Sequence, residues 1–334
     1  MKKNLTISIA AYNVEKYIEE TLSSLVCENM DLLEVLIIDD GSKDKTYEIS
    51  KEFEKKYKGV FKVIKKSNGG YGSTINVGIE YAHGKYFKQL DGDDKYDTSA
   101  LNKFLIELNK VDTDIIYNPF VIWTKYENNI IRSDIENKKK SGNELNYYLS
   151  DIDCDLAMHS LCYKTSLLKK NNVKILENSF YTDTEYALYP FIYSNTIKVF
   201  TDPLYMYRMG DEGQSVSLNG MRKHYLDFEK VIKSIINNSE QKVNELPHDS
   251  KKDYIIKKVD NIICTAITNL IVALPLNINN YKYIKNIDKY VKEHAEIYYV
   301  NSKLHKSVYV FRKGNFLVYS LLHIYLLIKL KLKK

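Results

Sequence analysis

Cysteine is scarce in this chain, and neither sign of charge dominates. The 334 residues include four cysteines without a C-x-x-C pair, which excludes a disulfide-stabilised scaffold and favours a reducing, cytoplasmic compartment. The 49 Lys and Arg residues outnumber the 43 Asp and Glu residues by six. So small an excess gives no sign of a nucleic-acid partner, and we expect none.

Long hydrophobic runs are also missing. The mean hydropathy of −0.37 excludes a protein with many membrane spans. Hydrophobic residues nevertheless make up 44% of the chain, which suffices for a large core and excludes wholesale disorder. The apolar stretch 5–11 contains Thr6 and Ser8, and we interpret it as a strand rather than a signal peptide.

An apolar stretch near the C-terminus is too short to span a bilayer. Residues 316–328 are apolar apart from Ser320 and His323, and four lysines follow: Lys329, Lys331, Lys333 and Lys334. As a helix this stretch would extend about 20 Å, against about 30 Å for the hydrocarbon core. Two interpretations stay open: a helix packed on its own domain, and a helix at the inner face of the cell membrane whose lysines meet anionic lipid.

Strand and helix patterns alternate over the first ninety residues. Short β-branched runs predict strands at 7–10, 34–38, 60–64 and 85–90, and helical spacing predicts helices at 14–26, 46–57 and 75–82. Such alternation indicates βαβ units and an α/β fold with a mostly parallel central sheet.

A helical region is predicted beyond residue 215. Strand patterns at 115–117 and 120–123 precede a lysine-rich loop at 136–142, whereas apolar residues recur at helical spacing over 255–270 and 281–298. We therefore expect an α/β domain at 1–215 and a helical C-terminal region at 216–334.

Two acidic clusters each follow a predicted strand. Asp39 and Asp40 follow the second strand, and Asp91, Asp93 and Asp94 follow the fourth. Ligands of open α/β sheets bind beyond the carboxyl ends of the strands, so both clusters are expected at one pocket. Three carboxylates within four residues repel one another unless a cation compensates them. Mg²⁺ or Mn²⁺ held by Asp91 and Asp93 together with a substrate phosphate fits, the alternative being a solvated turn.

Other motifs are incomplete. The glycines at 69, 70 and 72 lack the lysine of a P-loop and the third glycine of a dinucleotide fingerprint. Tyr96 and Asn102 stand where an EF-hand requires glycine and glutamate. Cys154, His159 and Cys162 have no fourth zinc ligand at suitable spacing, which favours buried structural residues.

Four blocks in order resemble the family 2 glycosyltransferases, which are inverting enzymes with the GT-A fold. They are residues 7–13, the run from Val35 to Ser42, the stretch 68–79 with 82–86, and the run from Leu90 to Asp94, which is similar to the family's D-x-D motif. The resemblance covers about residues 5 to 215. It implies a nucleotide-binding GT-A domain that uses a divalent metal.

The resemblance also implies roles for single residues. Asp40 would contact the nucleotide base, and Ala10 and Tyr12 would line the base pocket. Asp91 and Asp93 would hold the metal and the diphosphate. The remaining positions expected to bind the nucleotide sugar are Asn68, Gly70, Asn76 and Gly92.

A general base must take the proton of the attacking acceptor hydroxyl. The family usually places it in a Glu-Asp pair, and Thr182-Asp183 occupies that place here, with threonine instead of glutamate. We therefore expect Asp183 to be the catalytic base; as an alternative or in addition, it caps a helix.

Two further positions have less support from the pattern. The segment 205–217 resembles the family segment that closes over the donor, which makes Arg208 a phosphate clamp or, alternatively, a member of a structural ion pair. His159 precedes residues 161–168, which resemble the family's acceptor-side helix. It would orient the acceptor or, alternatively, lie in the core.

The resulting hypothesis is a metal-dependent inverting glycosyltransferase with a nucleotide-sugar donor, expected to be a UDP-sugar. Its acceptor would be a hydroxyl of a glycan, a lipid-linked sugar or a protein, in surface polysaccharide or glycoconjugate synthesis. One alternative is a sugar-1-phosphate nucleotidylyltransferase, but residues 10–13 lack the glycine- and arginine-rich loop of those enzymes. The other is a carbohydrate- or metal-binding module without catalytic activity, which would need no base.

Overall fold

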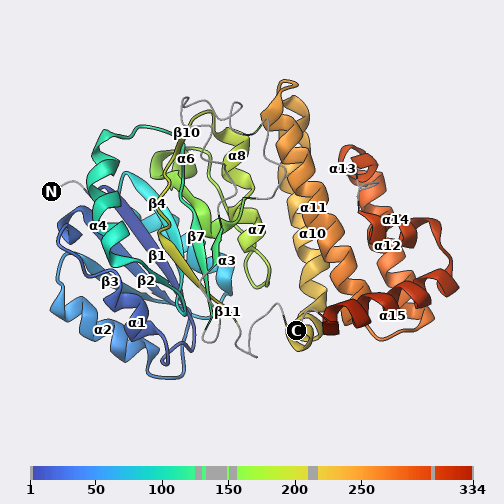
Figure 1. Ribbon diagram of the computed structural model, residues 1–334, viewed down its shortest axis with the longest axis horizontal. Helices are drawn as coiled ribbons and strands as arrows, with labels where there is room; N and C mark the ends of the chain where they lie inside the picture. Colours follow the sequence, from blue (N-terminus) through green and yellow to red (C-terminus); the bar gives the residue numbers. More distant parts are fainter. Residues whose placement is uncertain are drawn as a thin grey trace. The chain divides into compact units, whose positions relative to one another are not determined.

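The computed structural model describes residues 3–124, 130–132, 149, 156–209, 217–301 and 305–332 (Figure 1). The chain forms two compact units, the first made of residues 1–178 and 182–210 and the second of residues 179–181 and 211–334. Several expectations fall outside the described residues: the loop at 136–142, Cys154, the domain boundary at 215, the adjoining residues 214–216, and the last two lysines.

A seven-stranded sheet forms the centre of the first unit, with the strand order β10-β6-β9-β4-β1-β2-β3. Its strands are β1 (Leu5–Ala11), β2 (Leu33–Asp39), β3 (Phe61–Lys65), β4 (Tyr86–Asp91), β6 (Ile115–Tyr117), β9 (Leu161–Lys164) and β10 (Ile197–Val199). β1 pairs in parallel with β2 and β4, and β2 pairs in parallel with β3. Only β9 runs antiparallel to its neighbours, β4 and β6. The expected mostly parallel α/β sheet is therefore confirmed.

Helices connect the strands of this sheet and cover it. They are α1 (Ile18–Ser23), α2 (Thr46–Lys56), α3 (Tyr71–Tyr81), α4 (Thr98–Glu107), α6 (Thr165–Lys170), α7 (Asp183–Tyr186) and α8 (Tyr189–Tyr193), with 3-10 turns η1 (Met30–Leu32), η2 (Leu108–Lys110) and η3 (Met158–Ser160). Every apolar side chain of β1 and β2 except that of Ala10 is fully buried. Such burial is typical of parallel strands that are covered on both faces.

A second, four-stranded sheet has the order β5-β11-β7-β8. Its strands are β5 (Lys95–Tyr96), β7 (Phe120–Thr124), β8 (Ile130–Arg132) and β11 (Tyr205–Met209). β11 pairs antiparallel with β5, which lies only four residues beyond the end of β4. The sheet thus brings residues 205–209 next to the acidic turn that follows β4.

One sequence-based expectation about secondary structure is wrong. Residues 161–168, expected as a helix on the acceptor side, form strand β9 and then enter α6 at Thr165. A short apolar run does not distinguish strand from helix by its periodicity. Here Leu161, Cys162 and Tyr163 are fully buried, and the segment pairs with β4 on one side and β6 on the other.

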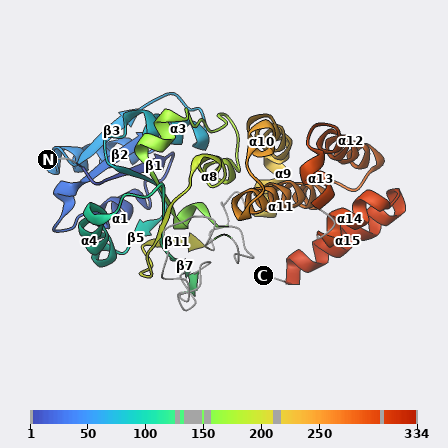
Figure 2. The ribbon, with the colours of Figure 1, turned by 90° about the horizontal axis from the view of Figure 1, so that it is seen from above.

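The described part of the second unit is helical, as expected (Figures 1 and 2). Its helices are α9 (Leu218–Lys223), α10 (Tyr225–Glu245), α11 (Ser250–Ala273), α12 (Ile278–His294), α13 (Glu296–Asn301), α14 (Lys306–Lys313) and α15 (Phe316–Leu332). Both views show α10 and α11 side by side. The Asp249 and Asn277 side chains cap α11 and α12 by accepting backbone hydrogen bonds from Lys252 and Asn280.

Among the described residues, no helix combines the length and the apolar character that crossing a bilayer requires.

Candidate functional site

The two acidic clusters lie at the same edge of the central sheet. Asp91 ends β4 and is paired in register with Ala10 of β1, while Asp39 ends β2 and is paired with Ala11. Because β1 lies between β2 and β4, a single strand separates the clusters. The carboxyl ends of these parallel strands therefore form one acidic edge, as the sequence predicted.

The surroundings of the Asp91 carboxylate raise its pKa. Its Oδ1 accepts a hydrogen bond of 2.5 Å from the Tyr71 hydroxyl. Burial raises the pKa of Asp91, and the charges of Asp93 and Asp183 raise it further, whereas the Tyr71 hydrogen bond lowers it. Since the charge of Asp183 acts on Asp91 across 92 positions of sequence, the fold has brought the expected base to the D-x-D turn.

Asp94 holds the acidic turn to the second sheet. Its Oδ2 accepts a hydrogen bond of 2.6 Å from Tyr205 Oη, and its Oδ1 accepts one of 2.7 Å from the Arg208 backbone N–H. Burial and the charges of Asp91 and Asp93 raise the pKa of Asp94 well above its usual value. The role of Asp94 in this structure is to fasten β11.

Gly92 allows the turn to approach β1 closely. A Cβ atom at this position would lie 2.8 Å from the Ala10 carbonyl oxygen and 3.0 Å from Val14 Cγ2. The Gly92 N–H donates to the same carbonyl at 3.0 Å. Any side chain here would displace Asp91 and Asp93, so the glycine positions the ligands rather than contacting them.

The carboxylates of this turn fit a divalent cation. Asp91, Asp94 and His159, which we call the sheet-edge trio, bring their potential ligand atoms within 4.8 Å of one another. Burial lowers the pKa of His159 to about 3, and the charge of Lys88 contributes to this shift, so the imidazole is neutral. Its Nδ1 is buried, without a hydrogen-bond partner in the described residues. The charge of Asp93 also acts on Asp91 and Asp94, and a cation would relieve the repulsion.

Asp40 organises a loop that sequence reasoning did not connect to it. Its Oδ1 accepts hydrogen bonds from Lys66 Nζ at 2.6 Å and from the Gly69 N–H at 2.9 Å, and its Oδ2 accepts one from the Gly70 N–H at 2.9 Å. The Asn68 side chain donates to the Asp40 carbonyl at 3.0 Å. Lys66 directly follows β3, and its position at a strand end on this edge was the available signal.

Asp39 differs from Asp40 in its partners. Its Oδ1 accepts one hydrogen bond, from the Ser42 N–H at 3.2 Å, while its buried Oδ2 has no hydrogen-bond partner among the residues that the structure describes. A buried acceptor without a donor is costly. Asp39 therefore has acceptor capacity for a ligand, whereas both carboxylate oxygens of Asp40 are engaged.

The other expected donor-binding residues fall into two groups. Ala10 lies between the two acidic strands, and Tyr12, just beyond β1, is 45% exposed. Gly70 has a φ of +79° and precedes α3, so the loop that Asp40 holds requires this glycine. By contrast, the Asn76 carboxamide is buried and bonded to Ile175 and Glu177. This geometry gives Asn76 a structural role.

Asp183 is the first residue of α7. Its charge contributes to the raised pKa of Asp91, Tyr71 and Tyr207. The N-cap position belongs to Thr182, whose side chain makes no capping hydrogen bond, so the helix-cap interpretation of Asp183 is wrong. Glu185, two residues later, is buried and accepts hydrogen bonds from the Leu176 N–H at 2.6 Å and from Tyr189 Oη at 2.9 Å. Sequence reasoning missed this buried carboxylate.

Arg208 forms the structural ion pair that was its alternative interpretation. Its Nη2 lies 2.6 Å from the Glu20 carboxylate, and its Nε donates to the Asp93 carbonyl at 2.8 Å. The guanidinium also stacks over Trp123, at 4.2 Å from the ring centroid. In this structure Arg208 thus connects the acidic turn to Glu20 of α1.

His159 packs among aromatic rings in η3. Its ring stacks on Tyr207 with centroids 4.3 Å apart and meets Tyr205 edge-on at 4.8 Å. Lys88 donates to the His159 carbonyl at 2.8 Å. With β9 in place of the expected helix, His159 belongs to the sheet-edge trio rather than to an acceptor-side helix.

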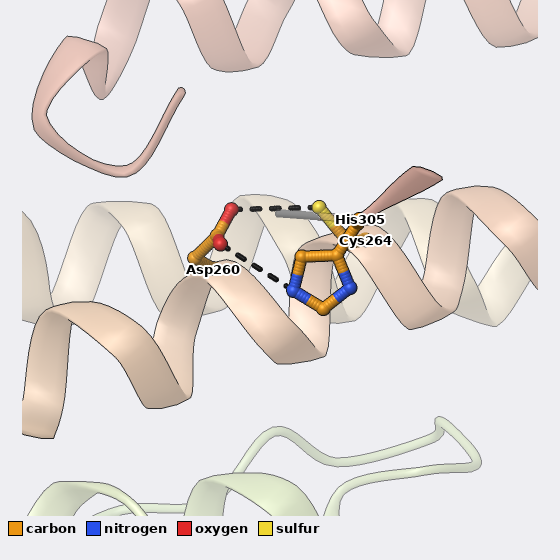
Figure 3. Close-up of side chains that lie close together, drawn as sticks. All are labelled: Asp260, Cys264 and His305. Carbon is orange, nitrogen blue, oxygen red and sulfur yellow. Dashed lines mark hydrogen bonds and ion pairs between the residues drawn. The ribbon is translucent and has the colours of Figure 1, made fainter. Parts of the chain in front are cut away.

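A second group of possible metal ligands lies in the helical unit, far along the chain from the first. Asp260, Cys264 and His305, which we call the helical trio, also place their ligand atoms within 4.8 Å of one another (Figure 3). The thiol of Cys264 donates to Asp260 at 3.4 Å, and His305 Nε2 lies 3.5 Å from the same carboxylate. These contacts connect α11 to the start of α14.

Comparisons with known proteins indicate a family for this chain. Residues 6–171 match the family model described as "Glycosyl transferase family 2". The glycosyltransferase EpsJ of Bacillus subtilis is 26% identical over 209 residues, which are 61% of this chain and 60% of EpsJ. The minor teichoic acid biosynthesis protein GgaB of Bacillus subtilis is 26% identical over 77% of this chain and 30% of GgaB. The chain thus covers less than two thirds of these relatives.

A solved structure extends the likeness to the helical unit. A crystal structure of Staphylococcus aureus TarS, residues 1–349, in complex with UDP-GlcNAc has a TM-score of 0.64 and 19% identity to this chain. The match covers 96% of this chain and 90% of that one. At this identity the likeness concerns the fold, and it confirms a GT-A-type domain followed by a helical region.

Proposed function

Because the chain belongs to glycosyl transferase family 2, we propose that it transfers a sugar from a nucleotide-sugar donor to a hydroxyl acceptor with inversion at the anomeric carbon. The observation that carries this proposal is the acidic edge formed by the carboxyl ends of β2 and β4, where the charge of Asp183 also raises the pKa of Asp91. Inverting transfer needs a base on the acceptor side and a charged donor-binding group close to it. Asp183 and the acidic turn supply both.

Asp91 and Asp93 are the residues proposed to hold Mn²⁺ or Mg²⁺. When bound, the metal would neutralise the charge that develops on the departing nucleoside diphosphate. Two features of the chain position Asp91 and Asp93. Tyr71 fixes one oxygen of Asp91 by its hydrogen bond, and Gly92 lets the turn lie against β1. Burial and the charge of Asp93 raise the pKa of Asp91 and of Asp94, and the relief of this repulsion supports a cation here.

Asp183 is the proposed catalytic base. Its carboxylate would accept the proton of the acceptor hydroxyl as the oxygen attacks the anomeric carbon. Asp183 is the first residue of the four-residue helix α7. Glu185 of the same helix accepts hydrogen bonds from the Leu176 N–H and the Tyr189 hydroxyl, so these bonds fix the segment without the Asp183 side chain. A positioned base of this kind contributes about 10²- to 10⁴-fold to a rate.

The donor is proposed to be a UDP-sugar. The TarS complex contains UDP-GlcNAc, and its fold resembles that of this chain. At the base pocket, Ala10 and Tyr12 are placed beside the acidic strands, and the buried Oδ2 of Asp39 is an acceptor suited to a base N–H. We therefore propose that Asp39, rather than Asp40, accepts from the base, while Asp40 holds the loop 66–70.

The acceptor is proposed to be a hydroxyl of a surface glycopolymer. The support is the name of GgaB, a minor teichoic acid biosynthesis protein that matches 77% of this chain. Of the two alternatives, a nucleotidylyltransferase would need a glycine- and arginine-rich loop after β1, where residues 10–13 read Ala-Ala-Tyr-Asn. A binding module without activity is distinguished by whether Asp183 matters for turnover.

The decisive experiment replaces Asp183 by Asn and measures donor binding and transfer separately. With the full chain, we expect UDP affinity in the presence of Mn²⁺ to remain within about twofold of wild type by calorimetry. Transfer, followed by mass spectrometry of glycerol-phosphate polymers incubated with UDP-sugars, should fall about 10³-fold or more, because the base is removed with little change in volume.

The matched control is Asp97→Asn, at the N-cap of α4, because its side chain accepts a hydrogen bond from the Ala100 N–H and asparagine caps equally well. This variant should retain both activities. Transfer retained by Asp183→Asn would place the base elsewhere.

A further inference from the structure

We propose that the outward face of α15 binds the surface of an anionic lipid bilayer, with the helix lying in the plane of the head groups. This inference does not depend on the proposed sugar transfer. It starts from side chains that are exposed in the structure although they are large and apolar.

The exposed face of α15 is a continuous apolar stripe. Its five members, which we call the α15 stripe, are Leu317 (68% exposed), Leu321 (64%), Ile324 (49%), Tyr325 (58%) and Ile328 (53%). Their spacing of three and four residues places them within about 100° of the helix circumference. Five of the sixteen large apolar side chains that are exposed in the described residues thus lie on this one helix.

The opposite face of α15 is packed on its own unit. Tyr319, Leu322 and Leu326 are buried, and the His323 ring bonds the Ile271 carbonyl of α11 at 2.6 Å. At the start of the helix, the Tyr281 hydroxyl donates to the Gly314 carbonyl at 3.1 Å. The two interpretations of this segment are therefore compatible. One face anchors the helix, so the α15 stripe cannot turn inward without breaking these contacts.

The charge of the chain is concentrated in the same region. Residues 297–334 contain eight Lys and Arg residues and no Asp or Glu. The whole chain has 49 basic and 43 acidic residues, so the other 296 residues have 41 basic and 43 acidic residues and a net charge of −2. The excess positive charge of the protein therefore belongs to its last 38 residues. Within it, Lys306, Lys313 and Lys329 are exposed in the structure.

This combination matches an anionic membrane better than other occupants. An apolar stripe flanked by lysines, with a tyrosine among its members, is typical of a helix at the boundary between head groups and acyl chains. A second copy of the chain would bring a second set of eight basic residues against the first. A transmembrane position does not fit, because one face of α15 is packed on its own unit through Tyr319, Leu322 and Leu326.

The test is sedimentation of the full chain with vesicles. One set contains phosphatidylcholine alone and the other equal parts of phosphatidylcholine and phosphatidylglycerol. We expect binding to the anionic vesicles that weakens as salt is added, and at least about tenfold weaker binding to the neutral vesicles. Equal binding to both sets, or binding to neither, would overturn the proposal.

Two variants separate the apolar and the ionic contributions. Leu321→Gln with Tyr325→Gln removes apolar surface from the α15 stripe and should weaken binding about tenfold or more. Lys329→Gln with Lys331→Gln should reduce the preference for anionic vesicles. Both pairs lie on one helix, so melting curves must show that α15 remains folded.

The matched control is Leu226→Gln, because Leu226 is 51% exposed on α10 of the same unit. It should leave vesicle binding unchanged, and an equal loss with this variant would contradict the assignment of the α15 stripe. Ultracentrifugation without lipid tests the other occupant. A dimer that the Leu321→Gln and Tyr325→Gln variant dissociates, together with no vesicle binding, would assign the face to contact between copies. UDP affinity should remain unchanged in all variants, which keeps this test separate from the donor site.

Discussion

The sheet-edge trio and the helical trio contain nearly the same chemistry but differ in how their charges are balanced. Each places two acidic or thiol groups and one histidine within 4.8 Å. In the helical trio, the Asp260 carboxylate accepts from Cys264 and faces His305, and the charge of Arg312 also lowers its pKa against the effect of burial. In the sheet-edge trio, burial and the charge of Asp93 raise the pKa of both Asp91 and Asp94, and the charge of Asp91 raises that of Asp94 further.

The comparison shows that ligand identity alone does not indicate a metal site. A cation stabilises a cluster little when its side chains already form hydrogen bonds and ion pairs with one another. It stabilises a cluster of carboxylates that repel one another at a sheet edge much more. Cationic side chains beside the two trios differ as well. Arg312 has its own carboxylate, since its Nε lies 2.7 Å from Asp288. Lys88, whose charge acts on His159, donates hydrogen bonds to the carbonyls of His159 and Leu161.

The strongest test of this comparison removes one carboxylate from each unit. We expect Asp93→Ala to weaken Mn²⁺-dependent UDP binding about 100-fold, or roughly 2.7 kcal/mol, because a proposed metal ligand is lost. Asp260→Asn should leave UDP binding unchanged. Calorimetry of both variants with and without Mn²⁺ measures the difference. Undiminished binding by Asp93→Ala would refute the metal assignment, and a loss with Asp260→Asn would remove the distinction between the two trios.

The helical trio should matter for stability instead. Asp260→Ala removes the buried carboxylate that His305 and Cys264 share, so we expect the free energy of unfolding to fall by about 2–4 kcal/mol in denaturant titrations. The control is Asp253→Ala, an exposed position in the first turn of α11, with an expected loss of about 0.5 kcal/mol. Equal losses in the two variants would show that the trio does not fasten the helices.

The buried lysine below the sheet-edge trio predicts a pH dependence. Burial lowers the pKa of Lys88 to about 8 in the folded protein, against 10.5 as its ordinary value. Between these values the unfolded chain holds a proton that the folded chain has released, so this group increases stability as pH rises. We expect the stability of wild type relative to Lys88→Met to increase by about 3 kcal/mol from pH 8 to 10.5. A constant difference across this range would contradict the expectation.

The smallest expected effect concerns the hydroxyl that supports Asp91. Tyr71→Phe removes the hydrogen bond to Oδ1, which both orients the carboxylate and lowers its pKa. We expect about fivefold weaker UDP binding in Mn²⁺, equivalent to roughly 1 kcal/mol. Cys264→Ala, the corresponding removal of a donor to the helical trio, should leave UDP binding unaltered. A similar weakening in both variants would indicate a global effect of destabilisation.

The sheet was predictable because its signal is local. Strands β1 to β4 and the helices between them follow from apolar periodicity, and the two acidic clusters follow from residues at the strand ends. The second sheet was not predictable in this way. β11 pairs with β5 and β7 across about a hundred positions, and β9 fills a gap whose shape is set by β4 and β6.

The side chains that pair with the site residues were also not predicted from the sequence. The sequence identified Asp40 and Arg208 as polar residues near the pocket, but not that Lys66 and Glu20 would engage them. Such pairings depend on side-chain directions after folding, which a linear pattern does not contain. Lys66 could have been inferred from its position at a strand end, whereas Glu20 on α1 carries no comparable signal.

The segment 179–181 connects Asp183 to the helical unit in an unusual way. These three residues belong to the helical unit, where the Tyr181 ring stacks on Phe228 with centroids 4.2 Å apart and Phe180 stacks on His224. Tyr181 itself adopts a φ of +65°, which only these packing contacts justify for a residue with a side chain. Asp183 follows two peptide bonds later. A change in how Tyr181 packs in the helical unit therefore reaches the backbone of Asp183 through only two peptide bonds.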